Sequence, residues 1–258
     1  MPRLKLLIAY EGTNFHGWQR QDPPGKEPLR TVQGVMESVA GAVLGHPVRV
    51  AGASRTDTGV HARGQVAALD TNTAIPTERV ARAINSRLPE DVEVLSAEVV
   101  GSEFEPVTHA TSKCYRYSLL HGAQHSQRAP IFERRFVAVT VHRLDVARMQ
   151  AVAACFVGTH DFRAFAHDPD SRETTVRSVH SCLVRATDAQ HVVIEISGSG
   201  FLHHMVRIIS GTLLEAGRGR IEPNQVLQAL ETRDRTLAGP TMPPDGLCLE
   251  WIHYGPRN

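Results

Sequence analysis

The sequence lacks the features that mark zinc-binding, membrane-spanning and secreted proteins. Its cysteines are scattered, without a Cys-x-x-Cys pair, and are Cys114, Cys155, Cys182 and Cys248. This spacing argues against a zinc site and favours small buried thiols in a reducing compartment. No apolar run approaches the roughly 20 residues that span a membrane, and the apolar stretch at the N-terminus is too short for a signal peptide. We therefore expect a cytoplasmic globular protein with no membrane contact.

An excess of charge of one sign is also absent. The 28 lysines and arginines nearly balance the 27 acids, so the net charge of +1 does not indicate a nucleic-acid partner. The stretch 113–143 is the exception, because only Glu133 opposes its basic residues, which are Lys113, Arg116, Arg128, Arg134, Arg135 and Arg143. This stretch is either a solvated face or a surface that follows phosphates.

The spacing of apolar residues predicts the order of helices and strands. The 258 residues are enough for one large or two small domains. The predicted strands are Leu4–Tyr10, Val48–Ala53, Gly64–Asp70, Val92–Val100, Cys114–Leu120, Thr175–Arg185, His191–Ser199 and Leu247–Tyr254. The predicted helices are Thr31–Leu44, Pro76–Leu88, Leu144–Phe156, Leu202–Ala216, closed by Gly217, and Pro223–Glu231. This order predicts an α+β fold of two tandem βαββαβ-like domains with antiparallel sheets, residues 1–105 and 106–258, divided near 101–111.

One acid stands in a tight polar loop between two predicted strands, in the run ASRTDTGVHA at residues 53–62. Asp57 is either a turn former that binds its own backbone amides or a reacting group that the strands hold rigidly. Arg55 and His61 add positive potential, which suits a carboxylate that acts as nucleophile or base. The next acid is Asp70, so a metal cluster or a paired-carboxylate glycosidase is poorly supported.

The run SRTDTGVHA resembles the signature of the tRNA pseudouridine synthase A (TruA) family. Five further motifs in the same order resemble that family: AYEGTNFHGWQRQ at 9–21, TVQG at 31–34, KCYRY at 113–117, FLHHMVR at 201–207 and DRTLAGPTMPPDGLCL at 234–249. The resemblance implies a pseudouridine synthase fold whose two domains join at a central RNA-binding cleft. It implies isomerisation of uridine to pseudouridine in the anticodon arm of tRNA, at positions 38, 39 and 40, without cofactor or metal. It also implies a homodimer that binds tRNA.

By this resemblance Asp57 is the catalytic carboxylate, which attacks a ribose or uracil carbon or removes a ribose proton. Arg207 is the implied ion-pair partner of Asp57, although the pattern alone also allows an arginine on the solvent face of a helix. Tyr115 is the implied catalytic and substrate-binding aromatic that stacks on the target base, with Tyr117 in reserve. Alternation on the strand also allows both rings to face the core.

Arg55 is the implied residue that fills the gap when the target base flips out. Its alternative is a salt bridge that braces the loop, for example to Asp70. Weaker candidates for substrate binding are His61, Arg63, Lys113, His203 and His204, of which the histidines are equally compatible with structural roles.

Three departures from the family pattern concern RNA docking and the choice of target. A loop is inserted at 22–30, the stretch before Lys113 lacks an arginine, and Val35 stands where an acid is common. Two other functions stay open at this stage: a catalytically idle tRNA-binding or tRNA-folding protein on the same fold, and, ranked last, a hydrolase with an aspartate nucleophile.

Overall fold

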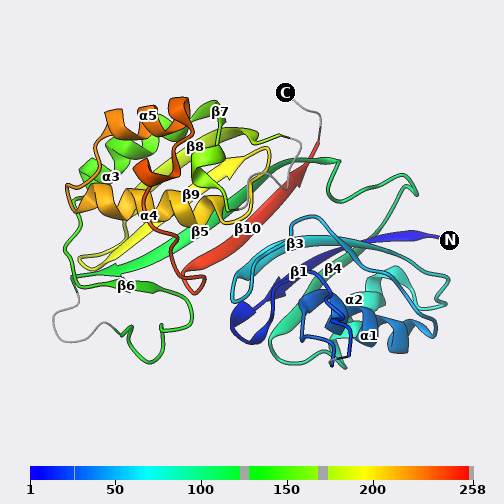
Figure 1. Cartoon of the computed structure of the whole chain (residues 1–258). Helices are drawn as coiled ribbons and strands as arrows, with labels where there is room; N and C mark the ends of the chain where they lie inside the picture. Colours follow the sequence, from blue (N-terminus) through cyan, green and yellow to red (C-terminus); the bar gives the residue numbers. More distant parts are fainter. Residues whose placement is uncertain (26, 123–127, 168–173, 256–258) are drawn as a thin grey trace. The chain divides into compact units, whose positions relative to one another are not determined.

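The computed structural model describes residues 1–25, 27–122, 128–167 and 174–255. The chain forms two compact units (Figure 1). Unit 1 comprises Met1–Thr111 and Cys248–Asn258, and unit 2 comprises Ser112–Leu247. The first division falls at the end of the predicted boundary region. All of the last strand except its first residue, however, belongs to unit 1 rather than to the second predicted domain.

The sheet of unit 1 has the order β4–β1–β3–β10, with β2 on β3. Its strands are β1 (Arg3–Tyr10), β2 (Ala51–Gly52), β3 (His61–Asp70), β4 (Val92–Val100) and β10 (Leu247–Tyr254), and its helices are η1 (Gly12–Asn14), α1 (Val32–Leu44) and α2 (Thr77–Asn85). Figure 1 shows α1 and α2 on one side of this sheet. Helix α1 begins where its sequence predicts, because Thr31 Oγ1 accepts a hydrogen bond from the Gly34 N–H at 3.2 Å.

One predicted strand of unit 1 is much shorter in the structure. Residues 48–53 were expected to form a strand, but only Ala51–Gly52 pair with β3. The backbone of Val50 is bound by side chains of α1 instead: its N–H donates to Glu37 at 3.1 Å, and its carbonyl accepts from Gln33 at 3.0 Å. Because these backbone groups are already satisfied by the helix, they do not join the sheet.

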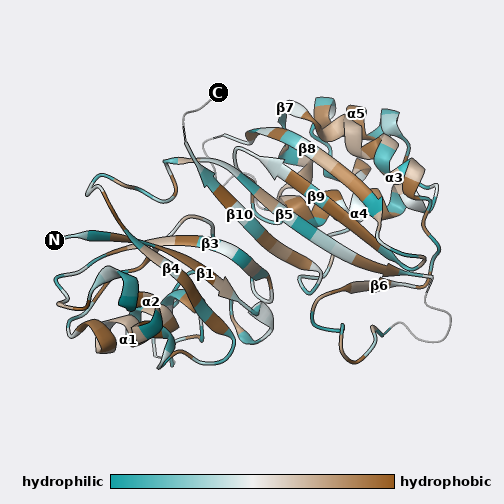
Figure 2. Ribbon diagram, turned by 180° about the vertical axis from the view of Figure 1, so that it is seen from behind, coloured by the Kyte–Doolittle hydropathy of each residue, from teal (hydrophilic) through white to brown (hydrophobic). Residues whose placement is uncertain are grey.

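The sheet of unit 2 has the order β5–β9–β8–β7, with β6 on β5. Its strands are β5 (Ala110–His121), β6 (Ala138–Thr140), β7 (Gly158–Asp161), β8 (Val176–Ala186) and β9 (His191–Gly198). Its helices are α3 (Val146–Ala153), η2 (Ala154–Phe156), η3 (Arg163–Phe165), α4 (Met205–Gly217), α5 (Pro223–Thr232) and η5 (Arg235–Leu237). Figure 1 shows α3, α4 and α5 gathered on one side of this sheet, and Figure 2 shows apolar residues along β5, β8 and β9.

Three expectations about the sheets and helices are wrong. The sheets are mixed rather than antiparallel, because β10 runs parallel to β3 and β6 runs parallel to β5. Helix α4 starts at Met205 rather than Leu202, since His204 has a left-handed backbone (φ 59°) that a helix cannot include. Gly217 lies inside α4, and the left-handed glycine that follows the helix is Gly219 (φ 72°).

Each unit has its own apolar core. Trp18 and Phe15 are 1% exposed in unit 1, and Phe156, Phe162 and Phe165 are fully buried in unit 2. No helix among the described residues is both long enough and apolar enough to cross a membrane.

Candidate active site

The Asp57 loop lies between β2 and β3 and is clamped by the segment that follows β1. The Trp18 N–H donates to the carbonyl of Thr56 at 3.1 Å, and the Gly59 N–H donates to the carbonyl of Phe15 at 3.2 Å. The Thr56 hydroxyl lies 2.7 Å from the hydroxyl of Tyr10. These contacts hold the backbone on both sides of the half-buried Asp57. The loop therefore has the rigidity that the placement of a reacting group requires.

A buried glutamine supports the same loop from β3. Gln65 is fully buried, and its amide accepts from the Ser54 N–H at 3.1 Å and donates to the Ser54 carbonyl at 2.6 Å. The clamp also requires the backbone at Gly17 to lie close to the backbone at Thr56. A Cβ on Gly17 (φ 84°) would lie only 2.7 Å from the Thr56 carbonyl oxygen, so a larger residue does not fit there. The sequence signal for this clamp is the glycine-containing motif at 9–21, to which no role was assigned from sequence.

The ring of His61 is held inside unit 1, and its part in substrate binding stays a prediction. It is 4% exposed, and its Nδ1 accepts a hydrogen bond from the Gly12 N–H at 2.9 Å. Because an imidazolium has no lone pair on Nδ1, this bond requires the neutral ring. The prediction that His61 adds positive potential to the loop is therefore wrong.

The two arginines of the loop region are exposed. Among the residues that the structure describes, Arg55 has neither an ion pair nor a side-chain hydrogen bond. The suggested bracing partner, Asp70, is bound instead by Arg3 at 3.0 Å. The guanidinium of Arg63 lies 3.8 Å from Glu250 Oε2, at the outer limit of an ion pair. An anionic ligand that binds to unit 1 can therefore reach both arginines.

In unit 2, the two tyrosines of β5 have different surroundings. Tyr115 is 6% exposed and meets Phe201 edge to face, with ring centroids 5.4 Å apart. Tyr117 is fully buried, and its hydroxyl donates to the Pro243 carbonyl at 2.7 Å. Burial raises the pKa of Tyr117, and the nearby charge of Arg207 only partly opposes this. The hydroxyl of Tyr117 is thus engaged within unit 2, and the substrate contact of Tyr115 stays a prediction.

Arg207 is half-buried on α4 and is held by residues 239–243. Its Nε donates to the Met242 carbonyl at 2.7 Å, and the Met242 N–H donates back to the Arg207 carbonyl at 3.2 Å. The segment reaches this close because Gly211 faces it: a Cβ there would lie 2.9 Å from the Pro240 carbonyl carbon and closer still to its oxygen. Residues 239–243 therefore position both Arg207 and Tyr117, a role for the motif at 234–249 that sequence reasoning missed.

The remaining candidates of unit 2 are a lysine and a histidine pair. Lys113 shares a face of β5 with Tyr115 and is 9% exposed, and burial lowers its pKa to about 8. His203 and His204 lie directly before α4 with ring centroids 4.0 Å apart. Burial of the Lys113 ammonium disfavours its charged form, and a lysine with a pKa lowered in this way is typical of functional sites.

The structure thus groups the predicted residues in two sets. Unit 1 carries Asp57 with Arg55, His61 and Arg63, and unit 2 carries the others, which are Tyr115, Lys113, Arg207, His203 and His204. The ion pair between Asp57 and Arg207 joins residues of different units and stays a prediction.

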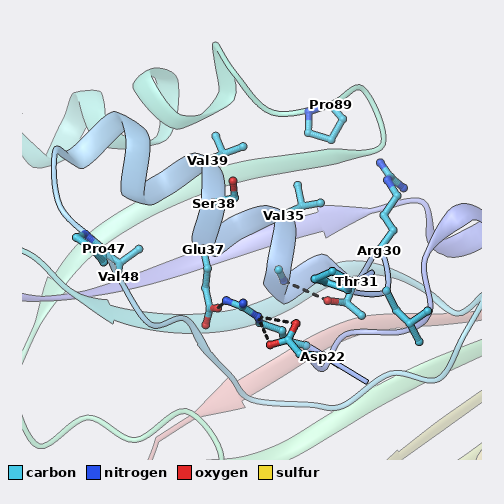
Figure 3. Close-up of a pocket in the computed structure, with 14 residues that line it drawn as sticks. Asp22, Arg30, Thr31, Val35, Glu37, Ser38, Val39, Pro47, Val48 and Pro89 are labelled. Atoms are coloured by element: carbon cyan, nitrogen blue, oxygen red, sulfur yellow. Dashed lines mark hydrogen bonds and ion pairs between the residues drawn. The ribbon is translucent and has the colours of Figure 1, made fainter. Parts of the chain in front are cut away.

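Unit 1 also has an open pocket of about 720 Å³ beside α1 (Figure 3). Asp22, Pro28, Leu29 and Arg30 of the inserted loop line it, and no predicted site residue does. Its charges are paired: Arg20 binds Asp22 at 2.9 Å and Glu37 at 3.3 Å. The insertion therefore shapes a surface that does not include the Asp57 loop.

Known proteins resemble the chain along nearly its whole length. A family model described as tRNA pseudouridine synthase matches residues 6–107 and 152–255. The tRNA pseudouridine synthase A of Acetivibrio thermocellus is 41% identical over 254 residues, which cover 98% of this chain and 100% of that protein. This chain belongs to the tRNA pseudouridine synthase family. Its members are isomerases, and the resemblance seen in the sequence is confirmed.

Other tRNA pseudouridine synthases give the same result. The tRNA pseudouridine synthase A of Geotalea uraniireducens is 41% identical, and tRNA pseudouridine synthase A 2 of Clostridium perfringens is 37% identical, each over 98% of this chain and 100% of the relative. Solved structures are less similar: the archaeal box H/ACA sRNP Nop10-Cbf5 complex matches with a TM-score of 0.38 and 15% identity, covering 94% of this chain and 49% of that chain. The assignment to the tRNA pseudouridine synthase family therefore rests on the sequence relatives.

Proposed function

We propose that the chain converts uridine to pseudouridine in the anticodon stem-loop of tRNA, at positions 38, 39 and 40. The observation that carries this proposal is the 41% identity, over the full length of the relative, to a tRNA pseudouridine synthase A. The reaction breaks the bond between ribose C1′ and uracil N1, rotates the base and joins C1′ to C5. The hydrogen on C5 leaves as a proton and N1 gains one. Atoms and electrons balance within the substrate and water, so the chemistry requires no redox cofactor.

Asp57 is the proposed catalytic carboxylate. The clamp formed by Trp18, Phe15 and Gln65 supports this role, because it fixes the loop backbone on both sides of Asp57. Asp57 attacks a ribose or uracil carbon, or it removes a ribose proton. Each route needs the ionised carboxylate at neutral pH, and a neighbouring guanidinium favours that form. We propose Arg207 as that partner, since Met242 holds its guanidinium in a single position.

Tyr115 is the proposed stacking residue for the target base. Its edge-to-face contact with Phe201 orients the ring in advance and lowers the entropic cost of binding a base. Arg55 is proposed to fill the gap in the stem when the base flips out, a step that costs a few kcal/mol. Its exposed side chain makes no ion pair within the described part of the chain, so it is available for stacking on RNA.

The tandem domains with a central RNA-binding cleft, and the homodimer, are implied by the family and belong to the same proposal. Lys113, Arg63, His203 and His204 are the proposed contacts to the RNA backbone. Such contacts position RNA without reading its sequence.

The test measures tritium released from an unmodified tRNA transcript labelled at uridine C5. Wild type is expected to release tritium and the near-isosteric Asp57→Asn variant none. Asp22→Asn is the matched control, because it makes the same chemical change at a side chain that is 50% exposed. RNA binding without release by wild type would instead support the idle tRNA-binding protein.

A further inference from the structure

A short loop of unit 2, residues 128–136, presents large apolar side chains to solvent. Phe132 is 94% exposed, Ile131 is 68% exposed and Phe136 is 48% exposed. The loop follows β5 and leads into β6 (Figure 1). Isolated apolar side chains are common on surfaces, but a fully exposed phenylalanine beside two further apolar residues is typical of an interaction site.

The loop has a defined backbone. The N–H groups of Glu133 and Arg134 both donate to the Pro130 carbonyl at 2.9 Å, and the Phe136 N–H donates to the Glu133 carbonyl at 2.7 Å. Glu133 also ties the loop to the β8–β9 hairpin, since its carboxylate lies 2.9 Å from Nε2 of His191. Phe132 is therefore displayed on a fixed turn, which lowers the entropic cost of using it in binding.

The charge of the loop indicates the kind of partner. Arg128, Arg134 and Arg135 are all exposed, and Glu133 is the one acid of the loop. Two copies of this loop packed together would bring like charges into contact, which costs free energy. A polyanion has the opposite charge, and an aromatic ring flanked by guanidinium groups suits unpaired bases and phosphates.

We propose that the 128–136 loop is a second RNA-binding surface, in which Phe132 stacks on an unpaired base and Arg134 and Arg135 contact phosphates. The proposal rests on the proposed function, since it takes the RNA to be the substrate tRNA. Glu133 of the loop contacts His191, which pairs with Leu120, and the stretch of β5 from Tyr115 to Leu120 spans about 17 Å. The loop therefore contacts a part of the RNA other than the target uridine. The loop lies outside the two stretches that the family model matches, residues 6–107 and 152–255.

The test compares Phe132→Ala with Leu183→Ala, a matched control at a side chain on β8 that is 52% exposed. Affinity for an unmodified tRNA transcript, tritium release and oligomeric state by light scattering are measured for both variants and for wild type. We expect Phe132→Ala to weaken binding roughly 5- to 100-fold, the range that loss of one base stack produces. Leu183→Ala should bind like wild type.

A second variant tests the arginines. In Arg134→Gln/Arg135→Gln, the slope of log affinity against log salt should become shallower by roughly 0.7–0.9 for each phosphate that the variant no longer neutralises. Wild-type affinity and slope in both variants would overturn the proposal. A change in oligomeric state with unchanged RNA affinity would also overturn it and make the loop an interface between copies. If wild type binds tRNA through this loop but releases no tritium, the proposed function fails while the RNA surface stands.

Discussion

Replacing Gly211 by alanine should push residues 239–243 away from α4. The added Cβ would lie 2.9 Å from the Pro240 carbonyl carbon, whereas carbon atoms in contact are about 3.5–4.0 Å apart. The segment must therefore retreat by about 1 Å. That movement would lengthen the bond from Arg207 to the Met242 carbonyl, now 2.7 Å, beyond hydrogen-bonding distance.

The expected cost combines three effects. Overpacking costs about 1–3 kcal/mol. Loss of a hydrogen bond to a charged group costs about 1.5–3 kcal/mol. The higher helix propensity of alanine returns about 1 kcal/mol. A net loss of about 1.5–5 kcal/mol should lower the Tm by roughly 3–20 °C for a protein of this size. Because Arg207 would lose the hydrogen bond that holds its guanidinium, kcat/KM should also fall, by on the order of 100-fold, at temperatures where the variant is folded.

Gly217→Ala is the matched control in the same helix. A Cβ there would lie 2.9 Å from Met149 Cγ and 3.0 Å from its sulfur, and this flexible side chain can move aside. Calorimetry and tritium release should therefore show a smaller loss of stability and near-normal turnover. The reasoning is refuted if Gly211→Ala keeps the wild-type Tm and activity, or if Gly217→Ala loses as much activity as Gly211→Ala.

Three further variants test individual side chains. Tyr117→Phe removes the hydroxyl that donates to the Pro243 carbonyl and should lower the free energy of unfolding in urea by about 0.5–1.5 kcal/mol, the net value of one hydrogen bond; an unchanged value would contradict the bond. Lys113→Met should raise stability at pH 7 by up to about 3 kcal/mol. The pKa of Lys113 is about 8 in the folded protein, below the usual 10.5, because burial disfavours its charged form. The wild-type protein therefore loses stability from the buried charge below pH 8, and this loss disappears as the pH rises to 10.5. A gain in stability that does not depend on pH would exclude desolvation as its cause. His191 is partly desolvated, which lowers its pKa, but hydrogen bonds to Glu133 and Asp188 raise it above 6.5 overall. Its contribution is therefore full below pH 6.5 and disappears as the pH rises through the raised value, so His191→Ala should lower the Tm more in acid than at alkaline pH.

Local patterns predicted most of the helices and strands. The bounds of β4 and β10 agree with the prediction, and α1 begins one residue after its predicted start, Thr31, which caps it. Alternation and capping depend on neighbouring residues, so they can be seen in sequence. The short strands β6 and β7 were missed, because three or four residues are too few to show a period.

The candidate site was predicted in part. The motifs identified Asp57, Tyr115 and Arg207 through resemblance, and their catalytic roles stay predictions. The supporting contacts were not predictable, since each joins distant parts of the chain, such as Gln65 with Ser54 and Met242 with Arg207. His61 shows the limit of residue type as a guide: a histidine in a loop suggested charge, and a backbone N–H on Nδ1 makes it neutral.

The sequence by itself determined the family, the α+β composition and the position of the Asp57 loop between two strands, because motifs and periodicity are properties of the chain order. Only the tertiary structure decided that β10 joins β3 in parallel, that Val50 binds α1 instead of the sheet, and that residues 239–243 hold Arg207. Each of these outcomes depends on which distant groups satisfy a backbone donor or acceptor. Tertiary packing decides which distant group binds each backbone donor or acceptor, and the local sequence does not predict that choice.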